Sequence, residues 1–171
     1  LLEQAARPEF SVLDQELTET IRALGLEGKS AAQVGCNNAR ELLSLASLKV
    51  IPSVGIDQSG AFLEQGRVLA KAAGLEPRLI EADIYDLPDD VGTFDLVLVT
   101  IGVLNWMPDL GGFFRVIAGL LGPGGHLLVY ETHPVMEMFD PESDTPHEPA
   151  ISYFRTDPLK EEGLISYDGV D

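Results

Sequence analysis

A run of apolar residues at 94–101 constrains the fold of this 171-residue chain more than any other feature of its sequence. Its members are mostly leucine and β-branched residues, and Asp95 is the one charged residue among them. Central strands of parallel sheets have this composition, because helices cover them on both faces. A helix that crosses a membrane needs roughly 18 or more consecutive apolar residues, and no run in this chain is that long. The run therefore predicts a buried strand in the middle of a parallel sheet.

Strand-like runs alternate with helical patterns along most of the chain. Further strands are predicted at residues 31–34, 50–56, 78–82 and 126–131, the last after a tight turn at 123–125. Helices are predicted at 16–26, 39–48, 60–73 and from residue 108 onward, where apolar residues recur at spacings of three and four. Such alternation is typical of βαβ units with parallel strands. The fold class is therefore predicted to be α/β, with a doubly wound, Rossmann-like, mostly parallel sheet.

The character of the sequence changes after the last predicted strand. Four prolines lie between residues 132 and 150, with acidic residues among them, which predicts an irregular loop. Residues 151–154 and 164–167 are predicted as short strands. We expect an N-terminal helical segment at 1–28, a core at 29–133, and a Pro-rich region with short strands at 134–171. Because the chain begins with Leu1 rather than Met, we expect its original N-terminus to lie further upstream.

The net charge narrows the range of partners. It is −17 at pH 7, from 28 acidic and 11 basic residues. A surface this negative repels phosphate backbones and anionic lipids. We therefore expect neither nucleic acid nor a membrane as a partner, and we interpret the acidity mainly as a contribution to solubility.

The chain has a single cysteine, Cys36. An intramolecular disulfide is therefore excluded and a cysteine-based zinc cluster is disfavoured, so no metal site is expected. Cys36 itself is predicted to pack as a small hydrophobe rather than to act as a nucleophile. Since no secretory signal is present, a reducing, cytoplasmic location is expected. The sequence leaves the oligomeric state open.

Small and polar residues follow four of the predicted strands, at the edge where doubly wound sheets bind ligands. A glycine after the first strand lets the backbone approach a ligand closely. A carboxylate after the second can accept both hydroxyls of a ribose, and one after the third can accept the amine of adenine while an apolar neighbour packs on the ring. Each residue alone also has a structural explanation, such as a helix cap, but their ordered recurrence favours a nucleoside site. The candidate cofactor-binding residues are Gly35, Cys36, Asn37, Asp57, Gln58, Asp83, Ile84, Thr100 and Ile101.

These strand ends resemble the motifs of class I S-adenosylmethionine-dependent methyltransferases between residues 29 and 138. The glycine-rich first motif is similar to AQVGCNN at 32–38, and the acidic second motif to VGIDQS at 54–59. The adenine motif resembles EADI at 81–84 with LP at 87–88, the fourth-strand motif FDLV at 94–97, and the next turn LGPGGHL at 121–127. The resemblance implies S-adenosylmethionine as cofactor and in-line methyl transfer to a small-molecule acceptor. It also implies seven strands, so we expect this chain to lack the C-terminal ones.

The first motif departs from the family, which carries three spaced glycines. The second and third are replaced by Asn37, which tolerates positive φ, and by Ala39, which is expected to add only a methyl group. Two alternatives stay open. An NAD-dependent oxidoreductase shares the first βαβ unit, but the chain has no Gly-x-Gly-x-x-Gly after the first strand and no Tyr-x-x-x-Lys pair. A non-catalytic module that binds or senses S-adenosylmethionine agrees with the altered glycine motif and the acidity.

The acceptor itself cannot be named from the sequence, but three features are candidates for its side of the site. His133, just beyond the fifth strand, is a candidate catalytic residue, and its alternative is an ordinary loop histidine. Asn105 and Trp106 follow the fourth strand and line the acceptor pocket in one interpretation, whereas Trp106 packs in the core in the slightly favoured one. Residues 134–150 are expected either to cover the pocket as a mobile loop or to plug a gap beside the fifth strand.

Overall fold

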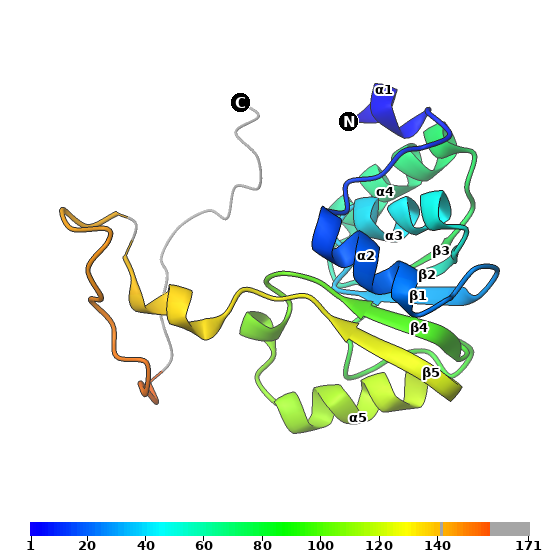
Figure 1. The fold of residues 1–171 in the computed structure, drawn as a ribbon. Coiled ribbons are helices and arrows are strands. Elements are labelled where there is room, and N and C mark those ends of the chain that lie inside the picture. Colours follow the sequence, from blue (N-terminus) through cyan, green and yellow to red (C-terminus); the bar gives the residue numbers. More distant parts are fainter. Residues whose placement is uncertain (141, 158–171) are drawn as a thin grey trace. The chain divides into compact units, whose positions relative to one another are not determined.

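The computed structural model describes residues 1–140 and 142–157, and five parallel strands form one sheet in that part of the chain (Figure 1). The order of the strands across the sheet is β3-β2-β1-β4-β5. Every neighbouring pair is parallel, so the predicted doubly wound sheet is confirmed. The strands are β1 (Ser30–Val34), β2 (Ile51–Asp57), β3 (Arg78–Glu81), β4 (Phe94–Val99) and β5 (Leu121–Val129).

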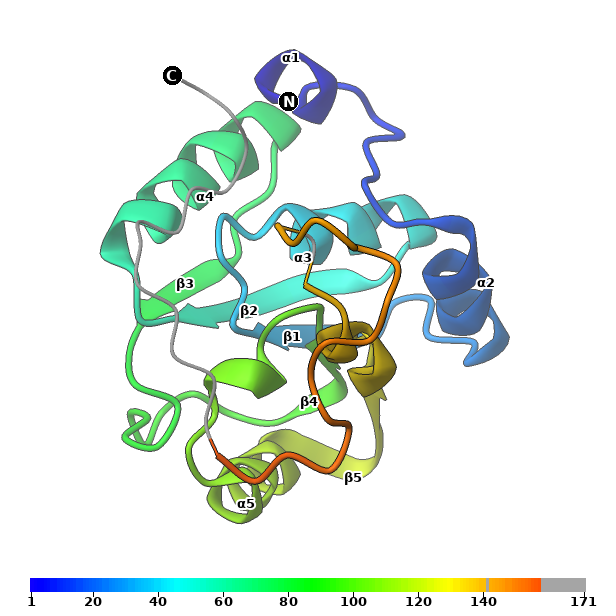
Figure 2. The same cartoon turned by 90° about the vertical axis from the view of Figure 1, so that its left-hand side faces the viewer.

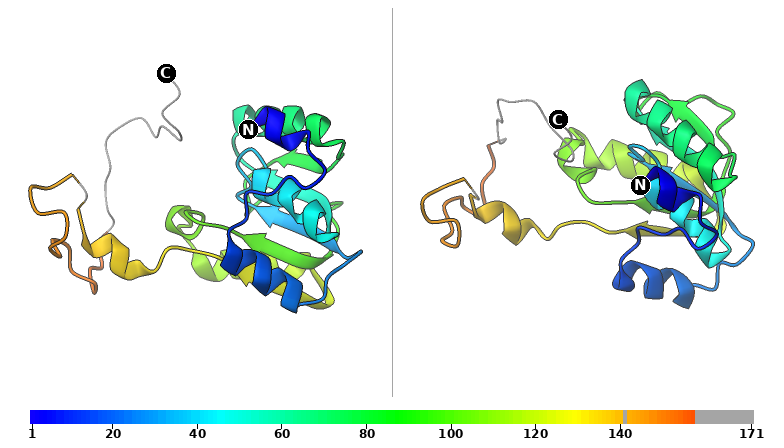
Figure 3. Two further views of the ribbon diagram at one scale, coloured as in Figure 1. Left: turned by 45° about the horizontal axis from the view of Figure 1, so that its top comes forward. Right: turned by 90° about the horizontal axis from the view of Figure 1, so that it is seen from above.

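Helices cover both faces of the sheet because side chains along each strand alternate in direction. Leu96 and Leu98 of β4 pack with α2 (Gln15–Ala23), α3 (Arg40–Ser44) and α4 (Gly60–Ala73). Val97 and Val99 pack with Phe113 and Ile117 of α5 (Leu110–Leu120) on the other face. Figures 1 and 2 show α5 across the sheet from α3 and α4, and Figure 3 shows α1 (Leu2–Ala5) beside α4, which it contacts. Residues 94–99 of the apolar run thus form the doubly covered strand that its composition predicts.

The order of the strands reverses between β1 and β4. From β1 the chain runs outward to β2 and β3, and then returns to pair β4 with the other side of β1. In doubly wound sheets, ligands bind beyond the carboxyl ends of the strands at such a reversal. Gly35 directly follows β1 and Thr100 directly follows β4, so both lie at this point.

Several predicted boundaries differ from the observed ones. Helix α4 matches its prediction and ends at Gly74, whose φ of 67° is the left-handed conformation that glycine adopts readily. The helix predicted at 39–48 is instead the short α3 followed by a 3₁₀ helix, Leu45–Leu48. The helix predicted at 16–26 ends at Ala23, and β4 ends at Val99, two residues earlier than predicted, where the chain turns. For these elements the pattern gave the correct type and approximate position but not the boundaries.

The fifth strand begins earlier than predicted. Leu121 already pairs with Phe94, whereas the next pair joins His126 to Leu96, so residues 122–125 project from the ladder at the place where a turn was predicted. A Cβ atom on Gly125 would lie 2.8 Å from the carbonyl oxygen of Phe94, so glycine is required there.

The chain divides into two compact units, Leu1–Glu131 and Thr132–Asp171, and the segment at 1–28 belongs to the first. The second unit contains a 3₁₀ helix, Pro134–Met138, so the prediction of a wholly irregular segment is wrong there. Proline fits at the start of this helix because the first turn does not need its missing N–H group. The described part of 134–150 adds no strand to the sheet, as predicted, and Phe139 and Pro149 form an isolated bridge. The strand predicted at 151–154 is wrong, because these residues form a turn, and the one at 164–167 lies outside the described residues. Within the described ranges, no helix has the length and apolar character to span a membrane.

Candidate cofactor site

The turn after β1 requires glycine at its first position. Gly35 has a φ of 64°, and a Cβ atom there would lie 2.5 Å from Cγ2 of Val103 in the loop after β4. Both the backbone conformation and the space therefore disfavour a side chain. The close approach joins the loops after β1 and β4, which flank the reversal of strand order.

The two residues that replace family glycines both have positive φ. Asn37 has a φ of 49°, which asparagine adopts more readily than most residues, as expected. Ala39 has a φ of 58°, so the prediction that it adds only a methyl group is incomplete. A left-handed conformation costs a non-glycine residue about 1–2 kcal/mol. The loop keeps the shape of a glycine-rich turn, with backbone strain at Ala39.

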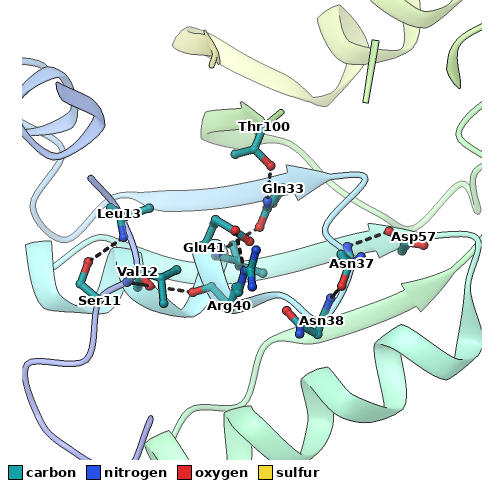
Figure 4. Close-up of polar contacts among 12 residues, drawn as sticks. Ser11, Val12, Leu13, Gln33, Asn37, Asn38, Arg40, Glu41, Asp57 and Thr100 are labelled. Carbon is teal, nitrogen blue, oxygen red and sulfur yellow. Dashed lines mark hydrogen bonds and ion pairs between the residues drawn. The ribbon is translucent and has the colours of Figure 1, made fainter. Parts of the chain in front are cut away.

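Asp57 connects the end of β2 to this turn (Figure 4). Its Oδ2 accepts a hydrogen bond from the backbone N–H of Asn37 at 2.7 Å, and its Oδ1 accepts one from the backbone N–H of Ser59 at 2.9 Å. A carboxylate has about four lone-pair sites, so each oxygen can still accept a hydroxyl. The half-buried carboxylate thus keeps spare acceptor capacity beside the glycine turn, and its bonds to a ribose stay a prediction. Gln58 next to it is exposed.

Three backbone donors of the turn are already used. The N–H groups of Asn37, Asn38 and Ala39 donate respectively to Asp57 Oδ2, to Oδ1 of Asn37 and to the carbonyl oxygen of Cys36. The cradle for a dinucleotide pyrophosphate consists of free N–H groups at this turn. The geometry therefore fits a nucleoside without a diphosphate better than it fits NAD.

Cys36 is fully buried within the turn. Burial raises the pKa of its thiol far above the usual range, and the negative charges of Asp57 and Glu41 raise this pKa further. The thiol therefore stays protonated and unreactive, which agrees with the packing role expected for this side chain.

Of the two residues predicted to bind adenine after β3, Asp83 is accessible to a ligand and Ile84 is almost wholly buried. Asp83 is exposed, and its Oδ1 accepts a hydrogen bond from the backbone N–H of Tyr85 at 2.9 Å, which leaves acceptor capacity for an amine. Ile84 is 7% exposed and packs in the core cluster with Phe113 and Val91, so little of its surface is left for a ring. Its contact with adenine stays a prediction.

Gln33 is a buried polar residue beside the candidate site, and sequence reasoning did not assign it a role. It is fully buried as the last residue but one of β1, and its Nε2 donates a hydrogen bond at 3.0 Å to Oγ1 of Thr100, the predicted site residue after β4. Its Oε1 accepts a hydrogen bond from the backbone N–H of Leu42 at 2.9 Å. A signal was present, since Gln33 is the only strongly polar residue in the predicted strand at 31–34.

The loop after β4 is held by Glu131, which sequence reasoning did not assign a role. The carboxylate of Glu131 accepts hydrogen bonds from the backbone N–H groups of Gly102 at 2.7 Å and Leu104 at 3.4 Å. The loop exposes Ile101 and Trp106, at 61% and 57% of their surfaces. The favoured prediction that Trp106 packs in the core is therefore wrong, because its 3₁₀ helix, Leu104–Trp106, turns it outward.

His133 lies in the second unit, where it caps the 3₁₀ helix that follows it. Its Nδ1 accepts a hydrogen bond from the backbone N–H of Val135 at 3.2 Å, and its side chain is exposed. Its catalytic role stays a prediction, as does the expectation that residues 134–150 cover the acceptor pocket. No group of three or more histidine, cysteine or acidic side chains gathers as a metal site in the described parts of the chain.

The fold and the strand ends together define a class of protein. A doubly wound parallel sheet that carries a glycine turn after β1, a carboxylate with spare acceptor capacity after β2 and a second carboxylate after β3 is typical of nucleoside-binding α/β domains. More narrowly, the chain belongs to the methyltransferase domain family, whose model matches residues 32–129, more than half of the chain. The family membership confirms S-adenosylmethionine as the cofactor predicted from the sequence.

Curated relatives agree with this family. The chain is 40% identical to a demethylmenaquinone methyltransferase of Thermus thermophilus over 84 residues, which are 47% of this chain and 36% of the relative. It is 30% identical to a demethylmenaquinone methyltransferase of Mycolicibacterium gilvum over 127 residues, which are 68% of this chain and 54% of the relative. The chain thus spans about half or less of the length of these relatives.

Solved structures show the same fold at lower sequence identity. A putative S-adenosylmethionine-dependent methyltransferase from Methanococcus maripaludis superposes with a TM-score of 0.62 at 19% identity, covering 80% of this chain and 60% of that one. An S-adenosylmethionine-dependent methyltransferase from Clostridium acetobutylicum superposes with a TM-score of 0.60 at 21% identity, covering 69% and 50%. The comparisons support a methyltransferase and neither of the two alternatives, the NAD-dependent oxidoreductase and the non-catalytic module.

Proposed function

We propose that this protein is an S-adenosylmethionine-dependent methyltransferase that transfers a methyl group in line to a small-molecule acceptor. The observation that carries the proposal is the bond between Asp57 and the N–H of Asn37, because it sets a half-buried carboxylate with spare acceptor capacity beside the glycine turn. This arrangement suits the two hydroxyls of a ribose and occupies donors that a diphosphate would need.

The work left to the protein is mainly positioning. S-adenosylmethionine supplies a methyl group on a positively charged sulfur that is a good leaving group. The protein holds the acceptor atom in line with that methyl group and excludes water. A base is needed only where the acceptor atom loses a proton of high pKa, and His133 is the candidate for that role.

We propose an apolar, ring-bearing acceptor of the quinone class. The loop after β4 leaves both Ile101 and Trp106 exposed, and apolar and aromatic side chains of this kind line the pockets of small apolar ligands. The curated relatives are named for methylation of demethylmenaquinone, which is a quinone. The net charge of −17 disfavours an anionic acceptor such as nucleic acid. A cytoplasmic location is proposed with this function on the basis of the single cysteine.

Calorimetric titration of the chain with S-adenosylhomocysteine and, separately, with NAD⁺ tests the cofactor. Saturable binding of S-adenosylhomocysteine and no binding of NAD⁺ are expected. Absence of binding at millimolar S-adenosylhomocysteine would sink the proposed function, and preferential binding of NAD⁺ would favour the oxidoreductase.

Turnover of demethylmenaquinone analogues tests the acceptor. Trp106→Ala is expected to raise the KM for the acceptor about tenfold, as loss of roughly 1.4 kcal/mol of apolar contact does, and to leave the Kd of S-adenosylhomocysteine unchanged. Val68→Ala is the matched control, because Val68 is an exposed apolar residue that lies in α4 and not in the loop after β4. This variant should change neither the KM nor the Kd. An unchanged KM in Trp106→Ala would remove this residue from the acceptor site.

A further inference from the structure

We propose that Gln33 is a positioning residue that fixes the hydroxyl of Thr100 as a hydrogen-bond donor toward the cofactor. The inference rests on the proposed function, because it concerns the same site. It assigns a role to a buried side chain that lies within β1, two residues before Gly35, rather than in the loops that follow the strands.

The buried amide of Gln33 connects two elements that flank the site (Figure 4). The residue lies in β1 with none of its surface exposed, and Nε2 reaches Oγ1 of Thr100 at 3.0 Å. Its Oε1 reaches the backbone nitrogen of Leu42, in the first turn of α3, at 2.9 Å. A buried amide with unpaired atoms is costly, so both bonds hold the side chain in a single orientation.

The direction of each bond follows from chemistry alone. A backbone N–H is only a donor, so the group of Gln33 that faces Leu42 must be the amide oxygen. The amide nitrogen, which is only a donor, must then face Thr100. Oγ1 of Thr100 is therefore the acceptor in this bond, and its own proton has to point elsewhere.

The proton of the Thr100 hydroxyl has no acceptor among the described residues. Thr100 is half-buried at the carboxyl end of β4, across the reversal of strand order from Gly35. A donor fixed there suits a ligand group that accepts hydrogen bonds, and the amino-acid end of S-adenosylmethionine carries such a group in its carboxylate. Preorganisation of this donor lowers the cost of ordering it when the ligand binds.

Gln33→Glu reverses the proposed arrangement with almost no change of shape. A carboxylate at this position still accepts from Leu42, but it can only accept from Thr100, so the hydroxyl proton turns inward. Burial raises the pKa of such a carboxyl group. At low pH the protonated group donates an O–H to Thr100 while its other oxygen accepts from Leu42, which restores the native arrangement.

The experiment is calorimetric titration of S-adenosylhomocysteine at pH 8 and pH 5 with the wild-type chain, Gln33→Glu, Thr100→Val and the double variant. At pH 8 each single variant is expected to raise the Kd about 10- to 100-fold, the range for a hydrogen bond to a charged group. The double variant should lose no more than either single one, because all three remove the same bond. At pH 5 the Kd of Gln33→Glu should return toward the wild-type value, whereas that of Thr100→Val should not.

The matched control is Ser44→Ala. Ser44 is also fully buried and polar, but its hydroxyl bonds the backbone of Val12 and Arg40 rather than a strand end at the site. This variant should be less stable in urea and should keep the wild-type Kd.

Three results would overturn the proposal: Gln33→Glu within twofold of wild type at pH 8, a loss that does not recover at pH 5, or Thr100→Val with wild-type affinity. The Thr100→Val result decides the matter if Gln33→Glu does not fold. Failure of the wild-type chain to bind would instead overturn the proposed function, and this inference with it.

Discussion

Substitution of Gly35 by alanine tests how tightly the turn after β1 is built. The new Cβ atom would lie 2.5 Å from Cγ2 and 3.2 Å from Cγ1 of Val103, at a backbone φ of 64°. The left-handed conformation costs an alanine about 1–2 kcal/mol, and overpacking of a buried contact costs about 1–3 kcal/mol. Gly35→Ala is therefore expected to lower the free energy of unfolding by about 2–5 kcal/mol.

Two further variants separate these costs in urea unfolding. Gly74 has a φ of 67°, and a Cβ atom added there would have no neighbouring atom within 4 Å, so Gly74→Ala should show the conformational cost alone, about 1–2 kcal/mol. Val103→Ala removes the two closest atoms, so in the double variant with Gly35→Ala the losses should sum to about 1–3 kcal/mol less than additivity predicts. Equal losses in Gly35→Ala and Gly74→Ala, or full additivity with Val103→Ala, would refute the steric explanation.

Three more predictions concern single side chains. Asp57→Ala should weaken binding of S-adenosylhomocysteine about 10- to 100-fold for each charge-assisted bond lost. Asp86→Ala is the control at an exposed loop position and should change the Kd less than twofold. Calorimetry measures both Kd values, and equal effects would mean that another residue binds the ribose. Asp95 accepts hydrogen bonds from the N–H and hydroxyl of Ser30, and these bonds, together with the charge of Lys29, lower the pKa of its carboxyl group. Its contribution to stability is therefore present above the ordinary aspartate pKa of about 3.9 and is lost as the pH falls through the lowered value. Asp95→Asn should reduce the Tm at pH 7 and reduce it less and less below pH 4, and a Tm difference that stays constant with pH would contradict this. The thiol of Cys36 should react with iodoacetamide only after unfolding, and rapid alkylation of the native protein, followed by mass spectrometry, would show that the turn opens.

The strength of each local signal explains how well the elements were predicted. The strand at 94–101 was evident because burial on both faces leaves almost no polar residue in it. The strand predicted at 151–154 was wrong because a short apolar run has the same composition in a turn as in a strand. Similarly, the outward position of Trp106 depends on a 3₁₀ helix whose three residues carry no periodic pattern.

The features of the candidate site likewise differ in how far they could be predicted from the sequence. The sequence by itself determined the order of strands and helices and the small or acidic residues at the strand ends, because hydrophobic period, glycine and aspartate act over a few neighbouring residues. Only the tertiary structure decided that Gln33 meets Thr100, 67 positions away, and that Glu131 holds the loop at Gly102, 29 positions away. These bonds depend on how β4 is inserted beside β1 and on the register of β5 against β4. Such register is set by the packing of two separate apolar layers across the sheet, which no single segment of the sequence contains.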